Sequence, residues 1–237
     1  MRPAQAGSDS VGALVPAAGL GVRLGPGEPK ALRELAGEPL LVHAVRTLRS
    51  VPSIGVVVVA APAPDVEAVG RLLVAYDVVV VPGGDDRQDS VHRTLAALPP
   101  DVDLVLVHDA ARCLTPGHVI EAVVAALRAG ADAVVPVLPI ADTVKHVEGV
   151  RVLGTVDRAA LRAVQTPQGF RREVLEQAHA AGRQAATDDA SLVEALGGTV
   201  TTVPGDDEAF KITRPLDLLL AEAVLAARSS RSGRHAR

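Results

Sequence analysis

The chain has 237 residues, of which 48% are apolar, and it carries a formal net charge of −4. This length can bury one large core, yet the chain holds only three aromatic side chains, Tyr76, Phe170 and Phe210. So few rings and a mildly acidic balance argue against nucleic-acid binding by base stacking or by a basic surface. Because Cys113 is the single cysteine, no disulfide can form within the chain, which suits a reducing cytoplasm.

The chain shows no sign of membrane attachment. No apolar run is long enough to span a membrane, and residues 11–20 run directly into a glycine-rich loop, as a strand does and a signal sequence does not. We therefore expect a cytoplasmic protein folded as a single domain over residues 1–237. Residues 228–237 contain four arginines and no acid, and their Ser, Arg and Gly content predicts a disordered tail.

Short β-branched runs alternate with helical patterns along most of the chain. Strands are predicted at residues 13–16, 55–60, 77–81, 103–107 and 133–137. Helices are predicted at residues 40–49, 66–75, 90–98, 117–129, 173–181, 190–196 and 215–227. This alternation is typical of an α/β fold with a Rossmann-like, mostly parallel sheet flanked by helices, which binds ligands beyond the carboxyl ends of its strands.

The alternation breaks at residues 138–158. Two short strands are expected there, residues 143–147 and 151–156, around a turn at Glu148-Gly149. No helix separates them, so we expect a β-hairpin arm that projects from the sheet. Since an isolated hairpin is only marginally stable in water, we expect the arm to rest on a second subunit of a homodimer.

The first strand leads into a loop of small residues. Bare backbone N–H groups in such a loop can approach a polyphosphate, and these small residues are Ala17, Ala18, Gly19 and Gly21. Arg23 and Lys30 would add positive charge for the same anion. The alternative is a glycine-rich turn without a ligand, because the spacing matches neither the dinucleotide fingerprint nor the phosphate loop. The added Arg and Lys favour a nucleoside triphosphate.

Two more candidate segments follow strands. Asp109 ends an aliphatic strand, where a carboxylate beside a triphosphate could hold Mg²⁺; alternatively it caps the next helix or pairs with Arg112. Gly84 and Asp85 follow another strand, with Ser90 shortly after. They could contact a base, or form a plain turn with Ser90 as the helix cap. Strand ends of one parallel sheet meet at one edge, so we expect all these segments at one site.

The histidines show no metal-binding spacing. His43 lies in a helical pattern and is predicted to be structural. We expect solvated surface positions for His92, His118, His146, His179 and His235.

Eight segments carry a resemblance to one family. They are Pro16-Ala17-Ala18-Gly19 through Pro29-Lys30, Gly83-Gly84-Asp85-Asp86-Arg87-Gln88-Asp89-Ser90, His108-Asp109-Ala110-Ala111-Arg112, Asp142-Thr143-Val144-Lys145, Thr155-Val156-Asp157-Arg158, Gln165-Thr166-Pro167-Gln168-Gly169-Phe170, Thr187-Asp188-Asp189-Ala190-Ser191 and Lys211-Ile212-Thr213-Arg214-Pro215. In this order they resemble the 2-C-methyl-D-erythritol 4-phosphate cytidylyltransferases of the non-mevalonate isoprenoid pathway. The resemblance extends over about residues 13–227.

The resemblance implies a reaction and a set of roles. The family joins CTP to methylerythritol phosphate and releases pyrophosphate, with Mg²⁺ as cofactor. By analogy Arg23 and Lys30 grip the triphosphate, Lys211 contacts the α-phosphate, and Asp109 lies near Mg²⁺. The residues implied to bind the nucleotide are Pro16, Ala17, Ala18, Gly19, Gly21, Gly84, Asp85, Ser90 and Ala110. Those implied to bind the sugar-alcohol phosphate are Arg112, Thr143, Arg158 and Thr166, with Thr143 and Arg158 reaching across a homodimer.

This assignment agrees with the chemistry of the reaction. The attacking group is a phosphate that is already ionised at neutral pH, so no strong general base is required. Catalysis then reduces to in-line alignment and charge neutralisation. The chain departs from the usual family pattern at Leu32, where an aromatic is often found, at Cys113, where Pro is common, and at Asp189, where many members carry Glu.

Three other functions remain possible on the sequence alone. A ribitol-phosphate cytidylyltransferase would share the CTP loop, Asp109 and Lys211. A non-catalytic nucleotide-binding module would keep the loop but perform no turnover. A nicotinamide dehydrogenase fits poorly, because no acidic residue closes the strand after the first helix at residues 56–61.

Overall fold

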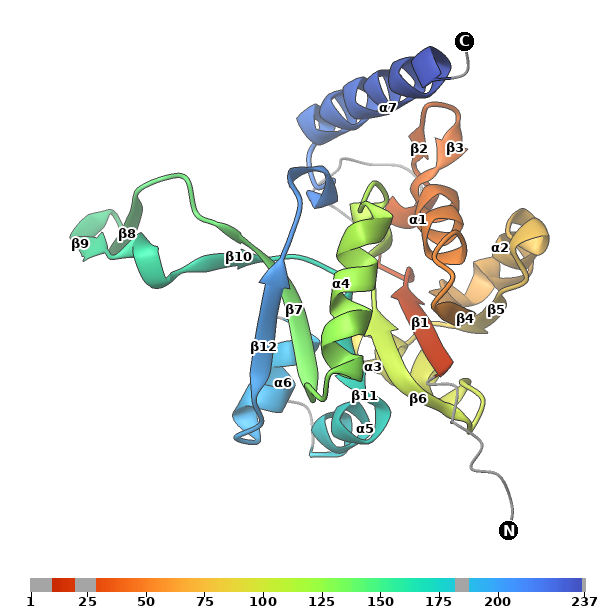
Figure 1. The fold of residues 1–237 in the computed structure, drawn as a ribbon, viewed down its shortest axis with the longest axis horizontal. Coiled ribbons are helices and arrows are strands. Elements are labelled where there is room, and N and C mark those ends of the chain that lie inside the picture. Colours follow the sequence, from red (N-terminus) through yellow and green to blue (C-terminus); the bar gives the residue numbers. More distant parts are fainter. Residues whose placement is uncertain (1–9, 20–28, 182–187, 236–237) are drawn as a thin grey trace.

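The computed structural model describes residues 10–19, 29–181 and 188–235, and these form an α/β fold around one eight-stranded sheet (Figure 1). From one edge, the strand order is β10 (Arg162–Val164), β7 (Ala133–Pro139), β11 (Gln168–Arg171), β6 (Val102–Val107), β1 (Ser10–Pro16), β4 (Ile54–Ala61) and β5 (Val79–Pro82). Strand β12 (Val200–Pro204) pairs with β7 in addition.

The sheet has a parallel half and a mixed half. Strands β6, β1, β4 and β5 are parallel neighbours, whereas β11 runs antiparallel to both β6 and β7, and β10 antiparallel to β7. From β1 the chain winds outward through β4 and β5, and then returns to β6 on the other side of β1. The carboxyl ends of β1 and β6 therefore border the crevice in which open α/β sheets bind ligands.

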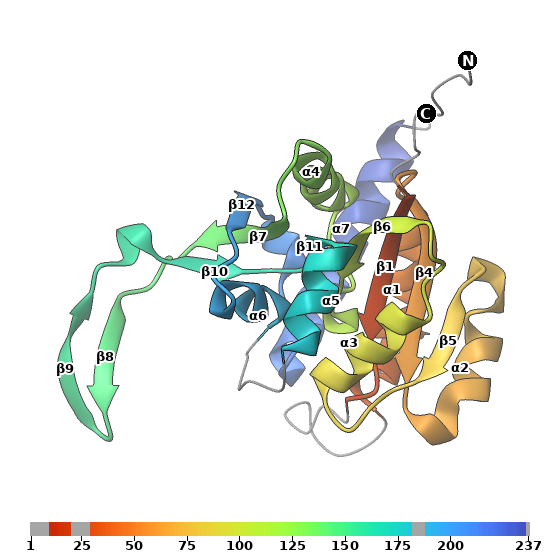
Figure 2. The same ribbon diagram turned by 90° about the horizontal axis from the view of Figure 1, so that it is seen from below.

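Helices cover both faces of the sheet (Figure 2). The first face carries α1 (Leu40–Arg49), α2 (Val66–Leu72) and α4 (Gly117–Arg128), and the second carries α3 (Arg87–Ala96), α5 (Arg172–Ala180) and α6 (Asp189–Ala195). Side chains of β1 alternate between the two cores, because Val15 joins the first core and Leu14 the second. The predicted α/β fold with a mostly parallel sheet is confirmed, and each predicted strand and helix has a counterpart.

The last helix, α7 (Pro215–His235), lies over the small hairpin of β2 (Glu34–Leu35) and β3 (Glu38–Pro39), with Ala221 buried there. The predicted disorder from Arg228 onward is wrong as far as His235, because the helix continues. Arg228 forms an ion pair with Glu208, and the Ser229 hydroxyl donates to a carbonyl one turn earlier. No helix in the described parts of the chain is long and apolar enough to cross a membrane.

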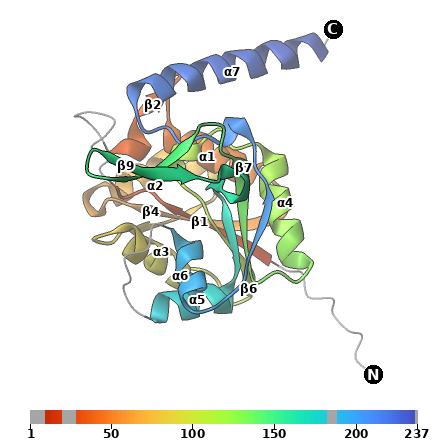
Figure 3. The same cartoon turned by 90° about the vertical axis from the view of Figure 1, so that its left-hand side faces the viewer.

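The predicted arm is present. Strands β8 (Val144–Glu148) and β9 (Arg151–Val156) pair with each other in a separate two-stranded sheet, and β7 and β10 lead to it from the main sheet. Figures 1 and 2 show the hairpin standing clear of the main sheet and its helices, and in Figure 3 it lies in front of them. Gly149 adopts a φ of 57° in the connecting turn, a backbone conformation that favours glycine.

Candidate active site

A cavity of about 260 Å³ opens at the carboxyl edge of β1, β5 and β6. It is lined by Pro16, Ala17, Ala18, Gly19, Lys30, Ala31, Gly84, Asp85, Asp86, Arg87, Ser90, Asp109, Ala110, Ala111 and Lys211. The structure thus gathers most of the residues predicted to bind a nucleotide, together with Lys30, Asp109 and Lys211. Gly21 and Arg23 lie outside the described residues, so their predicted roles stay predictions.

Two turns meet closely at the floor of this cavity. A Cβ on Gly83 would lie 2.3 Å from the Cβ of Ala18, and one on Gly84 would lie 2.0 Å from the Asp89 carboxylate. Glycine at position 83 therefore lets the turn after β5 approach the loop after β1, and glycine at position 84 lets the same turn close against Asp89 of α3. Both glycines are packing requirements of this turn beside the cavity.

Ser90 has a different role from the predicted helix cap. Asp86 caps α3 instead, since its carboxylate accepts a hydrogen bond from the Asp89 N–H at 2.7 Å. The buried Ser90 hydroxyl accepts from the Gly84 N–H at 3.0 Å and donates to the Asp86 carbonyl at 2.9 Å. Ser90 therefore holds the Gly84 turn in shape from inside α3.

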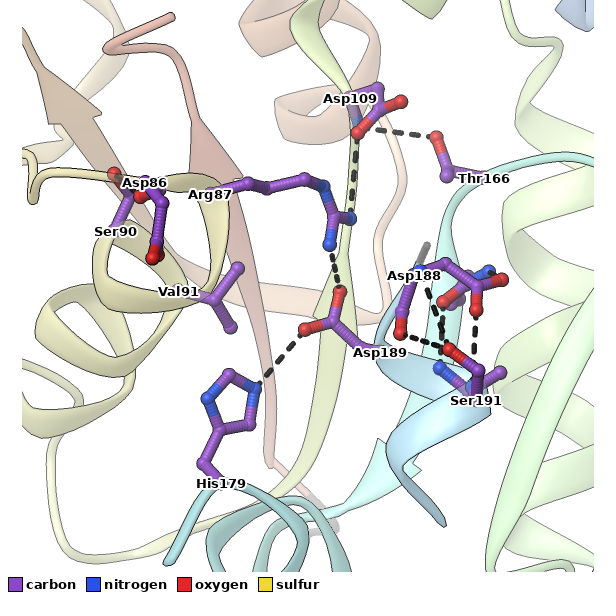
Figure 4. Close-up of polar contacts among 12 residues, drawn as sticks. Asp86, Arg87, Ser90, Val91, Asp109, Thr166, His179, Asp188, Asp189 and Ser191 are labelled. Atoms are coloured by element: carbon purple, nitrogen blue, oxygen red, sulfur yellow. Dashed lines mark hydrogen bonds and ion pairs between the residues drawn. The ribbon is translucent and has the colours of Figure 1, made fainter. Parts of the chain in front are cut away.

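Asp109 is the centre of the charged part of the cavity (Figure 4). Its Oδ2 lies 2.6 Å from Lys211 Nζ, and its Oδ1 lies 3.5 Å from Arg87 Nη2. Burial opposes ionisation of this carboxyl, but the charges of Arg87 and Lys211 outweigh it and lower its pKa. Neither alternative from the sequence holds, because the side chain makes no cap bond and its ion pairs are with Arg87 and Lys211, not with Arg112.

The donors around Asp109 fit a magnesium ion that arrives with a triphosphate. Mg²⁺ in nucleotide enzymes commonly takes one or two carboxylates and completes its shell with phosphate oxygens and water. The described residues contain no cluster of three or more His, Cys, Asp or Glu that could hold a metal without a ligand's help. Asp109 is the carboxylate that could bind such an ion, with Asp85 and Asp86 on the same cavity wall.

A second cavity of about 200 Å³ lies next to the first and shares Arg87, Asp109 and Lys211 with it. Two of the predicted substrate-binding residues, Arg112 and Thr166, line this cavity. The Thr166 hydroxyl accepts from the backbone N–H of Asp109 at 3.1 Å. The two cavities therefore meet at Asp109 and Lys211.

Arg112 also braces the structure around the second cavity. Its guanidinium donates to the Ala209 carbonyl at 2.8 Å and to the Val164 carbonyl at 3.0 Å. These bonds tie the segment that leads to Lys211 to the end of β10. Arg112 thus positions the backbone near Lys211 in addition to lining the cavity.

The arm residues predicted to bind substrate do not reach this site within one chain. Thr143 and Arg158 are exposed, and neither lines either cavity. Arg158 donates a hydrogen bond to the Ala141 carbonyl at the base of the arm. Their predicted role in a partner's site stays a prediction.

Sequence reasoning missed Arg87 and misplaced His179. Arg87 occurs in a quoted motif, and its position directly after a turn at the sheet edge was the available signal. The prediction of a solvated His179 is wrong, because its side chain is 2% exposed and its Nε2 lies 3.1 Å from Asp189 Oδ1. The packing of α5 against α6 buries it, and no local pattern reports that packing.

Comparison with known proteins identifies the family. A family model described as "IspD: 2-C-methyl-D-erythritol 4-phosphate cytidylyltransferase" matches residues 11–227. The chain belongs to this family. A protein of Streptomyces avermitilis named 2-C-methyl-D-erythritol 4-phosphate cytidylyltransferase is 55% identical over 98% of each chain. Membership confirms the resemblance stated from the sequence and makes the chain a nucleotidyltransferase.

Solved structures of the family share the fold. The 2-C-methyl-D-erythritol 4-phosphate cytidylyltransferase of Thermus thermophilus is 41% identical, with a TM-score of 0.76 over 91% of this chain and 98% of that one. The 4-diphosphocytidyl-2C-methyl-D-erythritol synthase of Anaerococcus prevotii has a TM-score of 0.81 at 28% identity, over 92% and 99% of the two chains. The family fold therefore extends over nearly all of this chain.

Proposed function

We propose that the protein transfers the cytidylyl group of CTP to 2-C-methyl-D-erythritol 4-phosphate, giving CDP-methylerythritol and pyrophosphate. The observation that supports this most strongly is the meeting of Lys30, Asp109 and Lys211 in one cavity at the switch point of the sheet. Family membership then specifies which phosphates that charged centre handles. The proposed reaction belongs to isoprenoid precursor synthesis, and we propose the cytoplasm as its location.

The nucleotide would occupy the first cavity. The backbone of residues 16–19 would approach the triphosphate, and Lys30 would balance its charge, together with Arg23 from outside the described residues. Gly84, Asp85 and Ser90 would frame the cytosine, and Ala110 would face the ribose. Asp109 would hold Mg²⁺, which when bound neutralises phosphate charge.

The acceptor phosphate would enter from the second cavity, where Arg112 and Thr166 lie. Its oxygen attacks the α-phosphorus in line, and the bond from that phosphorus to the bridging oxygen of pyrophosphate breaks. Lys211 lines both cavities. It would stabilise the charge on the α-phosphate while the acceptor oxygen bonds to the phosphorus and the pyrophosphate oxygen leaves. No proton needs to be removed, because the acceptor is already an anion.

The acceptor site would be completed by a second subunit. In a homodimer the arm of one chain would place Thr143 and Arg158 beside the partner's acceptor phosphate. This accounts for two exposed polar residues on a hairpin that has no core of its own.

Pyrophosphate release tests the proposal. The protein is mixed with CTP, Mg²⁺ and either methylerythritol phosphate or ribitol 5-phosphate, with UTP replacing CTP as the base control. We expect release with CTP and methylerythritol phosphate. Activity with ribitol 5-phosphate alone would show that ribitol phosphate, and not methylerythritol phosphate, is the acceptor. CTP binding without turnover of either acceptor would show that the protein is a nucleotide-binding module.

A further inference from the structure

A connected series of ionic side chains runs from the second-face helices to the active site (Figure 4). His179 on α5 contacts Asp189 on α6, with 3.1 Å between Nε2 and Oδ1. The other Asp189 oxygen, Oδ2, accepts from Arg87 Nη1 at 2.6 Å. Arg87 in turn faces Asp109, so the series joins three helices to the cavity edge.

Asp189 is an ionised carboxylate inside the protein. Its side chain is 1% exposed, and burial acts to raise its pKa, but the hydrogen bond from His179 and the charge of Arg87 outweigh burial and lower it. The start of α6 does not need this charge, because Asp188 and Ser191 already form a capping box there. A buried ion pair is a poor way to gain stability alone, so the placement of Asp189 calls for another reason.

Arg87 contacts two carboxylates at unequal distances, and this difference suggests the reason. Its guanidinium is in close contact with Asp189, at 2.6 Å, and only in loose contact with Asp109, at 3.5 Å. Pairs of an arginine and a carboxylate are frequently short and bidentate. Asp189 restrains Arg87 from the opposite side.

We propose that Asp189, oriented by His179, is a positioning residue that holds Arg87 back from Asp109. Asp109 Oδ1 then stays available to the metal ion that the nucleotide brings, while Oδ2 holds Lys211. Without the Asp189 charge, Arg87 moves onto Asp109 and competes with that metal ion. This inference rests on the proposed function, and it assigns a role to residues that touch neither substrate.

The test is a double-variant cycle on the full-length protein with Asp189→Asn, Arg87→Gln and both together. Turnover of CTP with methylerythritol phosphate and the dissociation constant of CTP in Mg²⁺ are measured for each. We expect D189N to lose about 10- to 100-fold in kcat, the range for residues that orient a metal-binding carboxylate. In the R87Q background the same change has no further effect, because Asp189 acts through Arg87.

A merely structural role predicts a different outcome. D189N would then lose the same factor with or without Arg87, or would lose nothing, and either result overturns the proposal. Asp189→Glu keeps the charge and should recover most of the rate. If the parent protein binds CTP but does not turn over, the proposed function fails, and the same cycle in CTP affinity still decides the positioning role.

A second variant covers the case in which D189N does not fold. His179→Leu removes the hydrogen bond to Asp189 but keeps the carboxylate, so we expect a smaller loss of kcat that again disappears in the R87Q background. His92→Leu is the matched control. His92 is exposed, and its ring stacks on that of His179 with 6.5 Å between the ring centroids. Equal losses in H92L and H179L would contradict the assignment.

Discussion

The active-site edge and the arm are built in opposite ways. At the edge, Arg87, Asp109 and Lys211 come from three distant segments, and each partly buried charge is balanced by another. In the arm, the two strands are adjacent in the sequence, and the valines at 147 and 152 are 53% and 55% exposed. The conformation of the active-site edge depends on the whole three-layer core. The conformation of the arm depends on a single turn and on the surface that the arm contacts.

A substitution should therefore act differently in the two regions. Side chains at the edge are fixed by long-range packing, so their loss should change the chemical step. Side chains of the arm have no core beneath them, so their loss should change local order, assembly or the contacts that the arm makes with a partner subunit.

The largest expected effect is the loss of Lys211. Lys211→Met removes the cation between the two cavities and should lower kcat about a hundredfold or more, the scale for a charge-stabilising group. Lys145→Met is the control, because the Lys145 amine bonds to Thr155 within the arm. Pyrophosphate release measures both, and comparable losses in the two variants would erase the distinction between the regions.

A second effect concerns acid stability. Burial lowers the pKa of His108 to about 4 from 6.5, so between these values the unfolded chain binds a proton that the folded chain does not. The free energy of unfolding should therefore fall as the pH drops from 7 to 4, by about 3 kcal/mol from this residue. His108→Gln should flatten that slope in urea melts, and an equally steep slope in this variant would contradict the assignment to His108.

A third experiment asks whether the arm crosses to a partner. Lys30→Ala and Arg158→Ala chains are each expected to be inactive. If each site takes Lys30 from one chain and Arg158 from the other, random re-pairing in a two-fold dimer should restore roughly a quarter of the parent rate. Proven subunit exchange with no recovery of activity would count against the crossed arm.

The smallest expected effect is in the turn of the arm. Gly149 has a φ of 57°, so Gly149→Ala should destabilise the hairpin by about 1 kcal/mol, which faster hydrogen exchange of β8 and β9 amides would report. Gly154→Ala is the matched control, since a Cβ there meets open space at an ordinary φ. Exchange that is equally fast in both variants would mean that the turn does not hold the arm together.

Much of the fold and half of the site were predictable from local patterns. Strand–helix alternation depends on residue periods of two and of about four, which the sequence displays directly. The site followed because Asp109 and the turn at Gly84 come right after predicted strands. Lys211 follows no predicted strand, and only the family resemblance connected it to the others.

The misses have a common physical origin. Strand β11 has four residues and lies between two longer strands, so its neighbours, and not its own pattern, determine that it is a strand. Ser90 and Asp86 are both good caps, and the packing of the Gly84 turn decided between them. Arg228 was predicted to be disordered by composition, but an ion pair with Glu208 supports the helix there.

The class of fold, the order of its elements and the loops that meet at the sheet edge follow from backbone preferences over a few residues, so the amino-acid pattern alone predicts them. Which charges pair depends on how the helices pack in three dimensions. Arg87 and Asp189 are 102 positions apart, and their 2.6 Å contact exists because α3 and α6 pack on the same face of the sheet. Electrostatic pairing depends on distance in space, which a linear pattern does not contain.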